Sequence, residues 1–372
     1  MQQRPTVLIA GASGVIGQAA VEHFGSSGAW DVLALSRRVP DVAVRHEHIG
    51  VDLTDPTACA ALGPRLAGVT HLVYAALYEK PGLYAGWLER DQMERNLLML
   101  GNLMEPLLAH APGLTHVSAL QGTKAYGAHV HQIAVPARES APRDPHANFY
   151  WLQEDYLREK RVGAGWALTI WRPQVVFGEA IGVAMNMIPV LGAYAAICRE
   201  LGMPLAYPGR PGGVSEAVSA DLVARALGWA AMAPTARDET FNLTNGDVFT
   251  FANVWPAIAR AVGLEPAFGP PFSLVDFLMA HRDTWARIAA REGLREADLA
   301  RLVGESHHYA DLLFGVHAPA DADRAPVLVS TIKLRQAGFA DCEDTEAMFA
   351  RLLARMGERR ITPAFSAVAG AG

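Results

Sequence analysis

Short apolar runs alternate with longer amphipathic stretches over the first half of the chain. Residues 6–10 (TVLIA) form an apolar run typical of a buried strand, and residues 18–27 then space their apolar positions as a helix does. Further strands are expected at 31–38, 44–52, 70–77, 114–120 and 166–178, and a long helix at 91–111. Because parallel strands need crossover connections, this order predicts an α/β fold, a doubly wound parallel sheet of the Rossmann type.

The pattern loosens after about residue 179. Loops rich in proline and glycine separate helical stretches such as residues 275–294. Aromatic side chains in this part suggest a hydrophobic ligand, although they fit a core equally well: Phe277, Trp285, Tyr309 and Phe314.

Composition narrows the class of protein. With 372 residues, 51% of them hydrophobic, the chain can bury a core as one large domain or a domain and a half. The net charge of −6 comes without any basic block, so neither nucleic acid nor a membrane surface is an expected partner. No run approaches the ~18 apolar residues of a spanning helix, and no signal peptide is recognisable. The three cysteines form no CxxC pair, so we expect a cytoplasmic protein that binds a small molecule.

A glycine-rich turn, GASGVIG, follows the first expected strand. Gly11, Gly14 and Gly17 stand between that strand and the next helix, where backbone N–H groups and the helix N-terminus can hold a pyrophosphate. Such glycine spacing is common in ordinary turns. Its position in the first strand–helix unit is what indicates a dinucleotide site.

The end of the second expected strand indicates which dinucleotide binds. Ser36, Arg37 and Arg38 stand where an NAD site usually has an acid for the ribose 2′-hydroxyl. Guanidinium groups match a 2′-phosphate instead, which predicts NADPH/NADP+ as the cofactor, although a solvated strand end would look the same. Asp52 and Leu53 follow the third strand, where an acid could accept from the adenine amino group; Asp52 fits a turn equally well.

The segments 120–129 (LQGTKAYGAH) and 148–157 (NFYWLQEDYL) place a lysine and a tyrosine where a Rossmann-type reductase keeps its acid. In ordinary short-chain dehydrogenases, lysine follows the acidic tyrosine by four residues. Here Glu154 stands at that spacing from Tyr150, and the lysine near in sequence is Lys124, upstream. The alternative for Tyr150 is a packed aromatic residue in its NFYW cluster.

Other catalytic motifs are not recognisable. The histidine pairs belong to no HExxH motif and to no four-ligand array, so we expect no metal site; these pairs are His46/His48, His129/His131 and His307/His308. A GxSxG elbow and a P-loop are also missing, which leaves serine hydrolases and kinases without a motif.

Together these segments resemble the progesterone 5β-reductase and iridoid synthase-like enzymes. These form an atypical branch of the extended short-chain dehydrogenases/reductases, which reduce activated carbon–carbon double bonds with NADPH. The resemblance covers most of the chain and includes GASGVIG, LSRR, VSALQGTKAYG, NFYWLQEDYL, IWRPQVVFG and the C-terminal STIKLRQAGF. The chain departs from the plant pattern in having one residue fewer between Gln121 and Lys124, and VAMN at 183–186 instead of Ser-Met-Met-Asn.

The resemblance implies Lys124 and Tyr150 as the catalytic pair. It also implies that Ser13 to Val15 bind the pyrophosphate and that Val176 and Val183–Met185 line the nicotinamide. The full set of positions expected to contact the cofactor is Gly11, Ser13, Gly14, Val15, Ile16, Gly17, Ser36, Arg37, Arg38, Asp52, Leu53, Ala75, Ala76, Gln121, Tyr150, Val176, Val183, Ala184 and Met185.

These assignments define the expected domains. Residues 1–178 form the dinucleotide-binding domain, to which a segment at about 215–250 returns. Residues 179–360 form mainly a smaller, mostly helical cap for the substrate, and residues 361–372 a flexible tail.

The predicted reaction is NADPH-dependent reduction of the C=C bond of a small hydrophobic enone. Hydride addition to the β-carbon creates an enolate, which a neutral Tyr150 hydroxyl can stabilise. Lys124 would support the electrostatics of Tyr150 or bind the cofactor ribose, and a carboxylate at Glu154 facing the same way would favour the protonated phenol. A carbonyl reductase or epimerase on the same scaffold and a non-catalytic NADP(H)-binding regulator remain alternatives, and a homodimer is left open.

Overall fold

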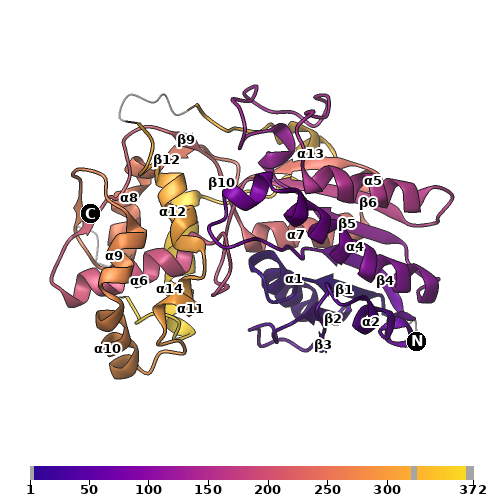
Figure 1. Ribbon diagram of the computed structural model, residues 1–372, viewed down its shortest axis with the longest axis horizontal. Coiled ribbons are helices and arrows are strands. Elements are labelled where there is room, and N and C mark those ends of the chain that lie inside the picture. The colour runs from indigo at the N-terminus through magenta and orange to yellow at the C-terminus, as the bar shows by residue number, and fades with distance from the viewer. Residues whose placement is uncertain (1–3, 320–324, 366–372) are drawn as a thin grey trace. The chain divides into compact units, whose positions relative to one another are not determined.

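The computed structural model describes residues 4–319 and 325–365 (Figure 1). The chain divides into two compact units. The first unit runs to Gln174 and includes Ala220–Thr244 and Val329–Cys342, and the second unit takes the other described residues.

Seven parallel strands form the sheet of the first unit, counted over the described residues. Their order is β11-β6-β5-β4-β1-β2-β3, which confirms the predicted Rossmann-type sheet. The strands are β1 Thr6–Ala10, β2 Asp31–Ser36, β3 Glu47–Gly50, β4 Val69–Tyr74, β5 His116–Leu120, β6 Ala167–Pro173 and β11 Thr240–Leu243. Since the chain moves from β1 toward β3 and then crosses back to β4, the switch point lies between β1 and β4, where such sheets bind ligands.

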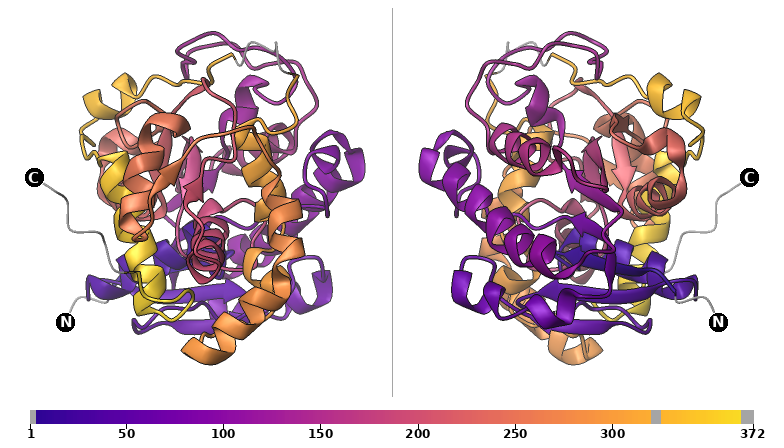
Figure 2. Two further views of the ribbon diagram at one scale, coloured as in Figure 1. Left: turned by 90° about the vertical axis from the view of Figure 1, so that its left-hand side faces the viewer. Right: turned by 90° about the vertical axis from the view of Figure 1, so that its right-hand side faces the viewer.

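Helices cover both faces of this sheet, which explains why its strands are mostly buried, whereas the edge strand β3 is partly exposed. The helices of the first unit are α1 Val15–Ser26, α2 Pro56–Ala60, α3 Gly63–Leu66, α4 Arg90–His110, α5 Phe149–Arg161, α7 Ala220–Met232 and α13 Ile332–Gln336, with 3-10 turns η1 Ala85–Leu88, η2 Thr123–Tyr126 and η3 Pro234–Ala236. Helices α1 and α7 pack together, and α4 packs against α2, α3 and α5. Figure 2 shows this N-terminal part from two further sides, its indigo and purple segments alternating between strand and helix.

The packing of α1 on α7 is very close. A Cβ added at Gly228 of α7 would lie 2.3 Å from Nε2 of His23 on α1. On the other face, Leu100, Leu103 and Leu107 of α4 are fully buried. This apolar row follows the helical period and anchors α4 along the sheet.

The second unit is mostly helical. Its elements are β7 Val175–Phe177, α6 Met187–Glu200, β8 Leu205–Ala206, β9 Val214–Ser215, β10 Ala217–Ser219, β12 Phe249–Thr250, α8 Phe251–Ala261, β13 Pro266–Ala267, α9 Leu274–Ala280, α10 Arg282–Glu292, α11 Leu299–Val303, α12 Ser306–Phe314 and α14 Thr345–Glu358. Helix α6 is buried along nearly its whole length. Trp285 and Phe314 are fully buried, and Phe277 and Tyr309 pack against the same cluster, so these four aromatic residues belong to the core.

Two details differ from the sequence-based expectations. The single strand expected at 166–178 is two strands, β6 and β7, because β6 pairs in the large sheet whereas β7 pairs with β10. The helical stretch expected at 275–294 is also divided, into α9 and α10, at His281.

The bounds of the two units can be compared with the domains expected from the sequence. Ala220–Thr244, within the expected returning segment, supplies α7 and β11 to the first unit. Val329–Cys342 was placed in the cap, yet it belongs to the first unit, where the carbonyl of Ser330 accepts from Nδ2 of Asn242 at 3.1 Å. Of the expected tail, Ile361 is buried, and residues 366–372 lie outside the described residues.

Candidate functional site

The turn after β1 is built around glycines that no other residue could replace without disturbance. Gly11 has φ +83°, and a Cβ there would lie 2.7 Å from the backbone of Ala75 and Ala76, which follow β4. A Cβ at Gly17 would lie 2.1 Å from the carbonyl oxygen of Gly11. Gly14 caps α1 and donates its N–H to that same carbonyl at 2.9 Å.

This turn fits a dinucleotide. Among the described residues, no side chain makes a capping hydrogen bond to the N-terminus of α1, whose first N–H groups are therefore open to an anion. Ser13, Val15 and Ile16 surround these N–H groups and are half-buried. The backbone cradle and the helix dipole thus meet the geometric needs of a pyrophosphate.

The residues after β2 and β3 were expected to bind the adenosine end. Arg37 and Arg38 are exposed beyond β2, and the hydroxyl of Ser36 donates to the carbonyl of Arg38 at 2.6 Å. Asp52 occupies a turn, because its Oδ1 accepts from the backbone N–H and hydroxyl of Thr54 at 2.9 and 2.8 Å. These hydrogen bonds hold the pKa of Asp52 below its usual range.

The turn that the sequence analysis gave as the alternative role of Asp52 is therefore present. Its adenine contact remains a prediction. Leu53 is buried, and its carbonyl accepts from Nδ2 of Asn102 on α4 at 2.8 Å.

Lys124 lies in η2, directly after β5. Its Nζ lies 4.1 Å from the ring centroid of Trp87, 5.7 Å from that of Phe149 and 5.9 Å from that of Tyr150. Oε1 of Glu79 lies 3.5 Å from the same nitrogen. Burial lowers the pKa of Lys124, and the charge of Glu79 acts in the opposite direction.

Tyr150 is the second residue of α5, and its place is set by a helix cap. The side chain of Asn148 accepts from the Tyr150 N–H at 3.0 Å, and its Nδ2 donates to the carbonyl of Lys124 at 3.0 Å. One asparagine thus fixes the positions of both residues expected to act in catalysis. A Cβ added at Gly122 would lie 3.4 Å from the Tyr150 hydroxyl, so this backbone passes close to the phenol oxygen.

Glu154 does occupy the helical position of the usual lysine, but its carboxylate is engaged elsewhere. It is buried, and it accepts from Nε2 of Gln121 and Nε of Arg158, both at 2.9 Å. Burial alone would raise the pKa of Glu154, but these hydrogen bonds together with the charges of Arg158 and Arg172 hold the pKa below its usual range. A charge neutralised in this way acts less on Tyr150 than the sequence-based hypothesis assumed.

The same network directs the side chain of Gln121. Its Oε1 accepts from Nε of Arg172 at 3.0 Å while its Nε2 donates to Glu154. Both ends of the amide are therefore used inside the first unit. The expected cofactor contact of Gln121 gains no support from these bonds.

The remaining expected contacts lie in the second unit. Val176 is the middle residue of β7, paired with Val218 of β10. Val183, Ala184 and Met185 are half-buried in a loop. Ser306 donates its hydroxyl to the carbonyl of Val183 at 2.8 Å, which fixes this loop within its unit.

Two polar residues near Lys124 were missed by the sequence analysis. Glu79 follows β4, and its side chain is only 4% exposed. Gln92 is buried on α4 and donates from Nε2 to Oε2 of Glu79 at 2.8 Å. Gln92 and Asn96 are polar residues one helical turn apart on the buried face of α4, and this is the signal that could have revealed them.

No group of three or more His, Cys, Asp or Glu side chains suited to a metal ion occurs in the described part of the chain. The imidazole of His129 packs on that of His146 with ring centroids 5.0 Å apart. Burial is the main cause that lowers the pKa of His129 to about 4, and the neighbouring His146 is the second cause. This ring is therefore neutral near pH 7.

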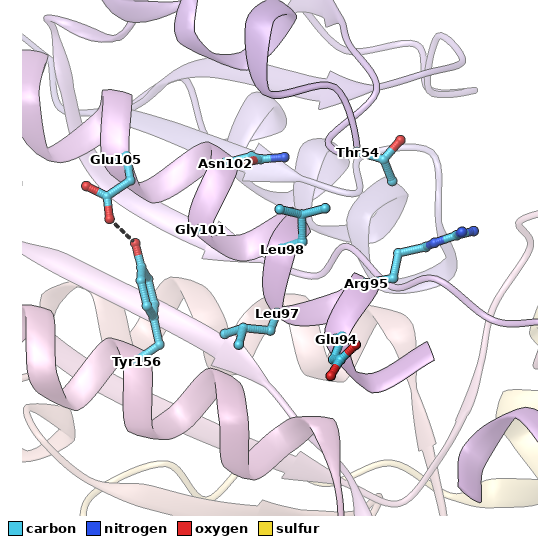
Figure 3. A pocket seen from close by; sticks show the side chains of 9 residues that line it. All are labelled: Thr54, Glu94, Arg95, Leu97, Leu98, Gly101, Asn102, Glu105 and Tyr156. Carbon is cyan, nitrogen blue, oxygen red and sulfur yellow. Dashed lines mark hydrogen bonds between the residues drawn. The ribbon is translucent and has the colours of Figure 1, made fainter. Parts of the chain in front are cut away.

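A separate groove of 950 Å³ runs along α4 (Figure 3). Figure 3 shows the hydroxyl of Tyr156 directed at Glu105, to which it donates at 2.9 Å. The groove is lined by Thr54, Glu94, Arg95, Leu97, Leu98, Gly101, Asn102, Glu105 and Tyr156. None of these is expected to touch cofactor or substrate, so the groove is not part of the candidate site.

Over the same described residues, no helix has the length and apolar character to cross a membrane.

Known proteins share this fold. The chain superposes on UDP-glucose 4-epimerase of Thermus thermophilus with a TM-score of 0.66 and 19% identity, covering 96% of this chain and 100% of that one. UDP-glucose 4-epimerase of Bifidobacterium longum gives a TM-score of 0.65 at 15% identity, covering 96% and 99%. At these identities the likeness establishes the fold.

Sequence relatives are more specific. The chain is 31% identical over 323 residues to an (S)-8-oxocitronellyl enol synthase of Nepeta cataria, covering 80% of this chain and 79% of that one. It is 31% identical over 336 residues to the 3-oxo-Δ4,5-steroid 5β-reductase of Arabidopsis thaliana, covering 85% and 84%. The model of the NAD dependent epimerase/dehydratase family matches residues 7–242. The chain therefore belongs to that family, and within it to the extended short-chain dehydrogenases/reductases of the progesterone 5β-reductase and iridoid synthase type.

Proposed function

We propose that this protein is an NADPH-dependent reductase that transfers hydride to the β-carbon of a small, hydrophobic enone. The observation that carries the proposal is the position of Lys124, whose Nζ lies 5.9 Å from the ring of Tyr150 although it comes from upstream of α5. A reductase cation is thus supplied beside the tyrosine by a different element. The names of the two relatives agree with this chemistry, since one denotes a steroid 5β-reductase and the other an enol synthase.

A bound NADPH supplies the hydride for this reaction. As the C–H bond forms at the β-carbon, the electrons of the C=C bond move into an enolate, and negative charge appears on the carbonyl oxygen. The hydroxyl of Tyr150 donates a hydrogen bond to that oxygen, a contribution of roughly 3–4 kcal/mol to the transition state when such a donor is well placed. Lys124 keeps the surrounding potential positive, and solvent protonates the α-carbon.

The absence of a lysine four residues after Tyr150 favours a phenol that acts as a donor and not as an acid. In a Tyr-x-x-x-Lys site, the lysine lowers the tyrosine pKa and prepares it for proton exchange with an alcohol. Here the side chain at that position is a carboxylate bound to Gln121 and Arg158. An enolate needs hydrogen bonding more than immediate protonation, so this arrangement favours attack at the β-carbon.

The choice of NADPH over NADH belongs to the same proposal. Arg37 and Arg38 are exposed at the end of β2, where the 2′-phosphate of NADPH would lie. Guanidinium groups bind phosphate oxygens through charge-assisted bonds, and no carboxylate directly follows β2.

Deuterium labelling tests the reaction directly. The enzyme is incubated with a reactive enone and NADPH deuterated at the transferred position, and the product is analysed by NMR. Label at the β-carbon with an unlabelled α-carbon is the expected result. An allylic alcohol with deuterium on the carbinol carbon would establish a carbonyl reductase instead, and no NADPH oxidation across a panel of enones, aldehydes and ketones would favour a regulator.

The proposed setting is the cytoplasm. Cys59, Cys198 and Cys342 are all free thiols, as a reducing compartment requires. Whether the protein forms a homodimer is tested by measuring its molar mass by light scattering as it elutes from a size-exclusion column.

A further inference from the structure

The carboxylate of Glu79 is held in a fixed orientation beneath the Lys124 ammonium. Its Oε2 accepts two hydrogen bonds, from Nε1 of Trp87 at 2.9 Å and from Nε2 of Gln92 at 2.8 Å. Its Oε1 is turned to Nζ of Lys124, at 3.5 Å. The two oxygens therefore have different partners, and rotation of the carboxylate would break three contacts at once.

The neighbours of Glu79 are themselves anchored. Oε1 of Gln92 accepts from the backbone N–H of Lys80 at 2.9 Å, so this glutamine connects α4 to the segment after β4. A Cβ added at Gly86 would lie 2.3 Å from the same oxygen, which shows how closely η1 packs on it. Trp87 both donates to Glu79 and presents its ring to Lys124 at 4.1 Å.

Burial makes this carboxylate important for the lysine. The side chains of Lys124 and Glu79 are only 13% and 4% exposed. A buried ammonium without an opposite charge tends to lose its proton, whereas an anion within about 4–6 Å stabilises the charged form. Burial does lower the pKa of Lys124, and Glu79 raises it again.

Other groups near Lys124 do not replace this anion. His129 lies close enough for the two charges to affect each other, but its pKa of about 4 leaves it neutral near pH 7. His146 contacts His129 edge to face, and Tyr150 presents its ring to Lys124. Among the described residues that face the ammonium, Glu79 is thus the one that supplies negative charge.

We propose that Glu79 is a positioning residue that keeps Lys124 charged and fixes it beside Tyr150. The assignment of Lys124 to catalysis rests on the proposed function, whereas the coupling of Glu79 to Lys124 does not. The sequence resemblance assigned no role to Glu79, and its role follows from the three side chains that orient it.

The test exploits the small number of lysines. The chain has four, Lys80, Lys124, Lys160 and Lys333. In protein labelled with ¹³C at the lysine ε-carbon, Lys124→Met identifies the Lys124 signal by its loss. Titration of the signals in protein that retains Lys124 then gives the protonation of each lysine without any activity measurement.

In Glu79→Gln, which keeps the shape and removes the charge, the midpoint of the Lys124 signal should move down by about one pH unit or more. The basic limb of kcat should move down by the same amount, because both report one proton. Glu79→Asp keeps the charge, so the Lys124 midpoint should move down by less than half of the shift seen in Glu79→Gln. Glu89→Gln is the matched control, because Glu89 pairs with the neighbouring Lys80 and should leave the Lys124 midpoint unchanged.

Two outcomes would overturn the inference. One is a Lys124 midpoint that stays in place in Glu79→Gln, and the other is an equal shift in Glu79→Asp and Glu79→Gln. Circular dichroism establishes that each variant is folded, and Glu79→Asp decides the question if Glu79→Gln is not. A wild-type enzyme that reduces no enone would refute the proposed function, yet the titration would still decide on Glu79.

Discussion

Restoring the usual lysine four residues after Tyr150, by Glu154→Lys, should destabilise this protein and not create an ordinary dehydrogenase. In the wild type, the buried Glu154 carboxylate accepts from Gln121 and Arg158. Arg143 adds a further cation, with its Nη2 at 3.6 Å from Glu154. A lysine at this position would lose both hydrogen bonds, because an ammonium group cannot accept, and would place a third positive charge beside Arg143 and Arg158.

The magnitude follows from the burial of each partner. The bond from Gln121 is buried and ends on a charged oxygen, so its loss costs about 1.5–3 kcal/mol. The Arg158 side chain is 50% exposed, and solvent reduces its contribution to about 0.3–1 kcal/mol. With a repulsion between like charges of similar size to the Arg158 contribution, the total loss in the free energy of unfolding should be about 2–5 kcal/mol.

Urea denaturation measures this loss as a lower transition midpoint at an unchanged slope. Asp155→Lys is the matched control, because the Asp155 side chain is 61% exposed and should cost less than about 1 kcal/mol. Glu154→Lys with wild-type stability would refute the assignment of Glu154 to a buried network. A variant that is stable and reduces ketones to alcohols would show that the position still communicates with Tyr150 as in ordinary relatives.

Three further predictions concern the reaction, the cofactor and the stability of the glycine turn. Tyr150→Phe should lower kcat by ~10²-fold or more with NADPH binding retained, because the lost bond strengthens only in the transition state, and full activity would remove the tyrosine from the mechanism. Arg37→Ala and Arg38→Ala should each weaken NADPH about tenfold in fluorescence titrations and leave NADH unchanged, whereas equal losses for both cofactors would refute a 2′-phosphate site. Gly17→Ala should destabilise the fold by about 1–3 kcal/mol in urea, since its Cβ would lie 2.1 Å from a backbone oxygen, whereas Gly101→Ala, which meets nothing within 4 Å, should be neutral or stabilising.

The sheet could be predicted from the sequence because its strands and helices have distinct periods. The sequence pattern marked six of the seven strands near their observed positions, the sixth continuing into β7, and the turn after β1 identified the start of the fold. The sequence failed where pairing is not local. Nothing in the pattern of 166–178 separates β6 from β7, since the partners β11 and β10 lie far along the chain. For the same reason, Val329–Cys342 could not be assigned to the first unit.

The candidate site was predictable only as far as its motifs extend. Spacing in the sequence showed that Glu154 stands in place of the usual lysine after Tyr150, because residues four apart on a helix share a face, and the family resemblance pointed to Lys124. It could not show which way the Glu154 carboxylate turns, since Gln121 and Arg172 come from other elements. Buried hydrogen bonds between distant segments leave no periodic signal.

The position of Glu79 has a structural reason that motifs do not express. Strands β4 and β5 are adjacent and parallel, so the segments that leave their carboxyl ends emerge side by side. Glu79 belongs to the segment after β4 and Lys124 to the segment after β5, and Trp87 contacts both side chains. Lys124, which lies outside α5, therefore has its counter-charge on a third segment. A related chain that retains Lys124 and Tyr150 but lacks an acid after β4 should carry a lysine that loses its proton at lower pH, however well its motifs match.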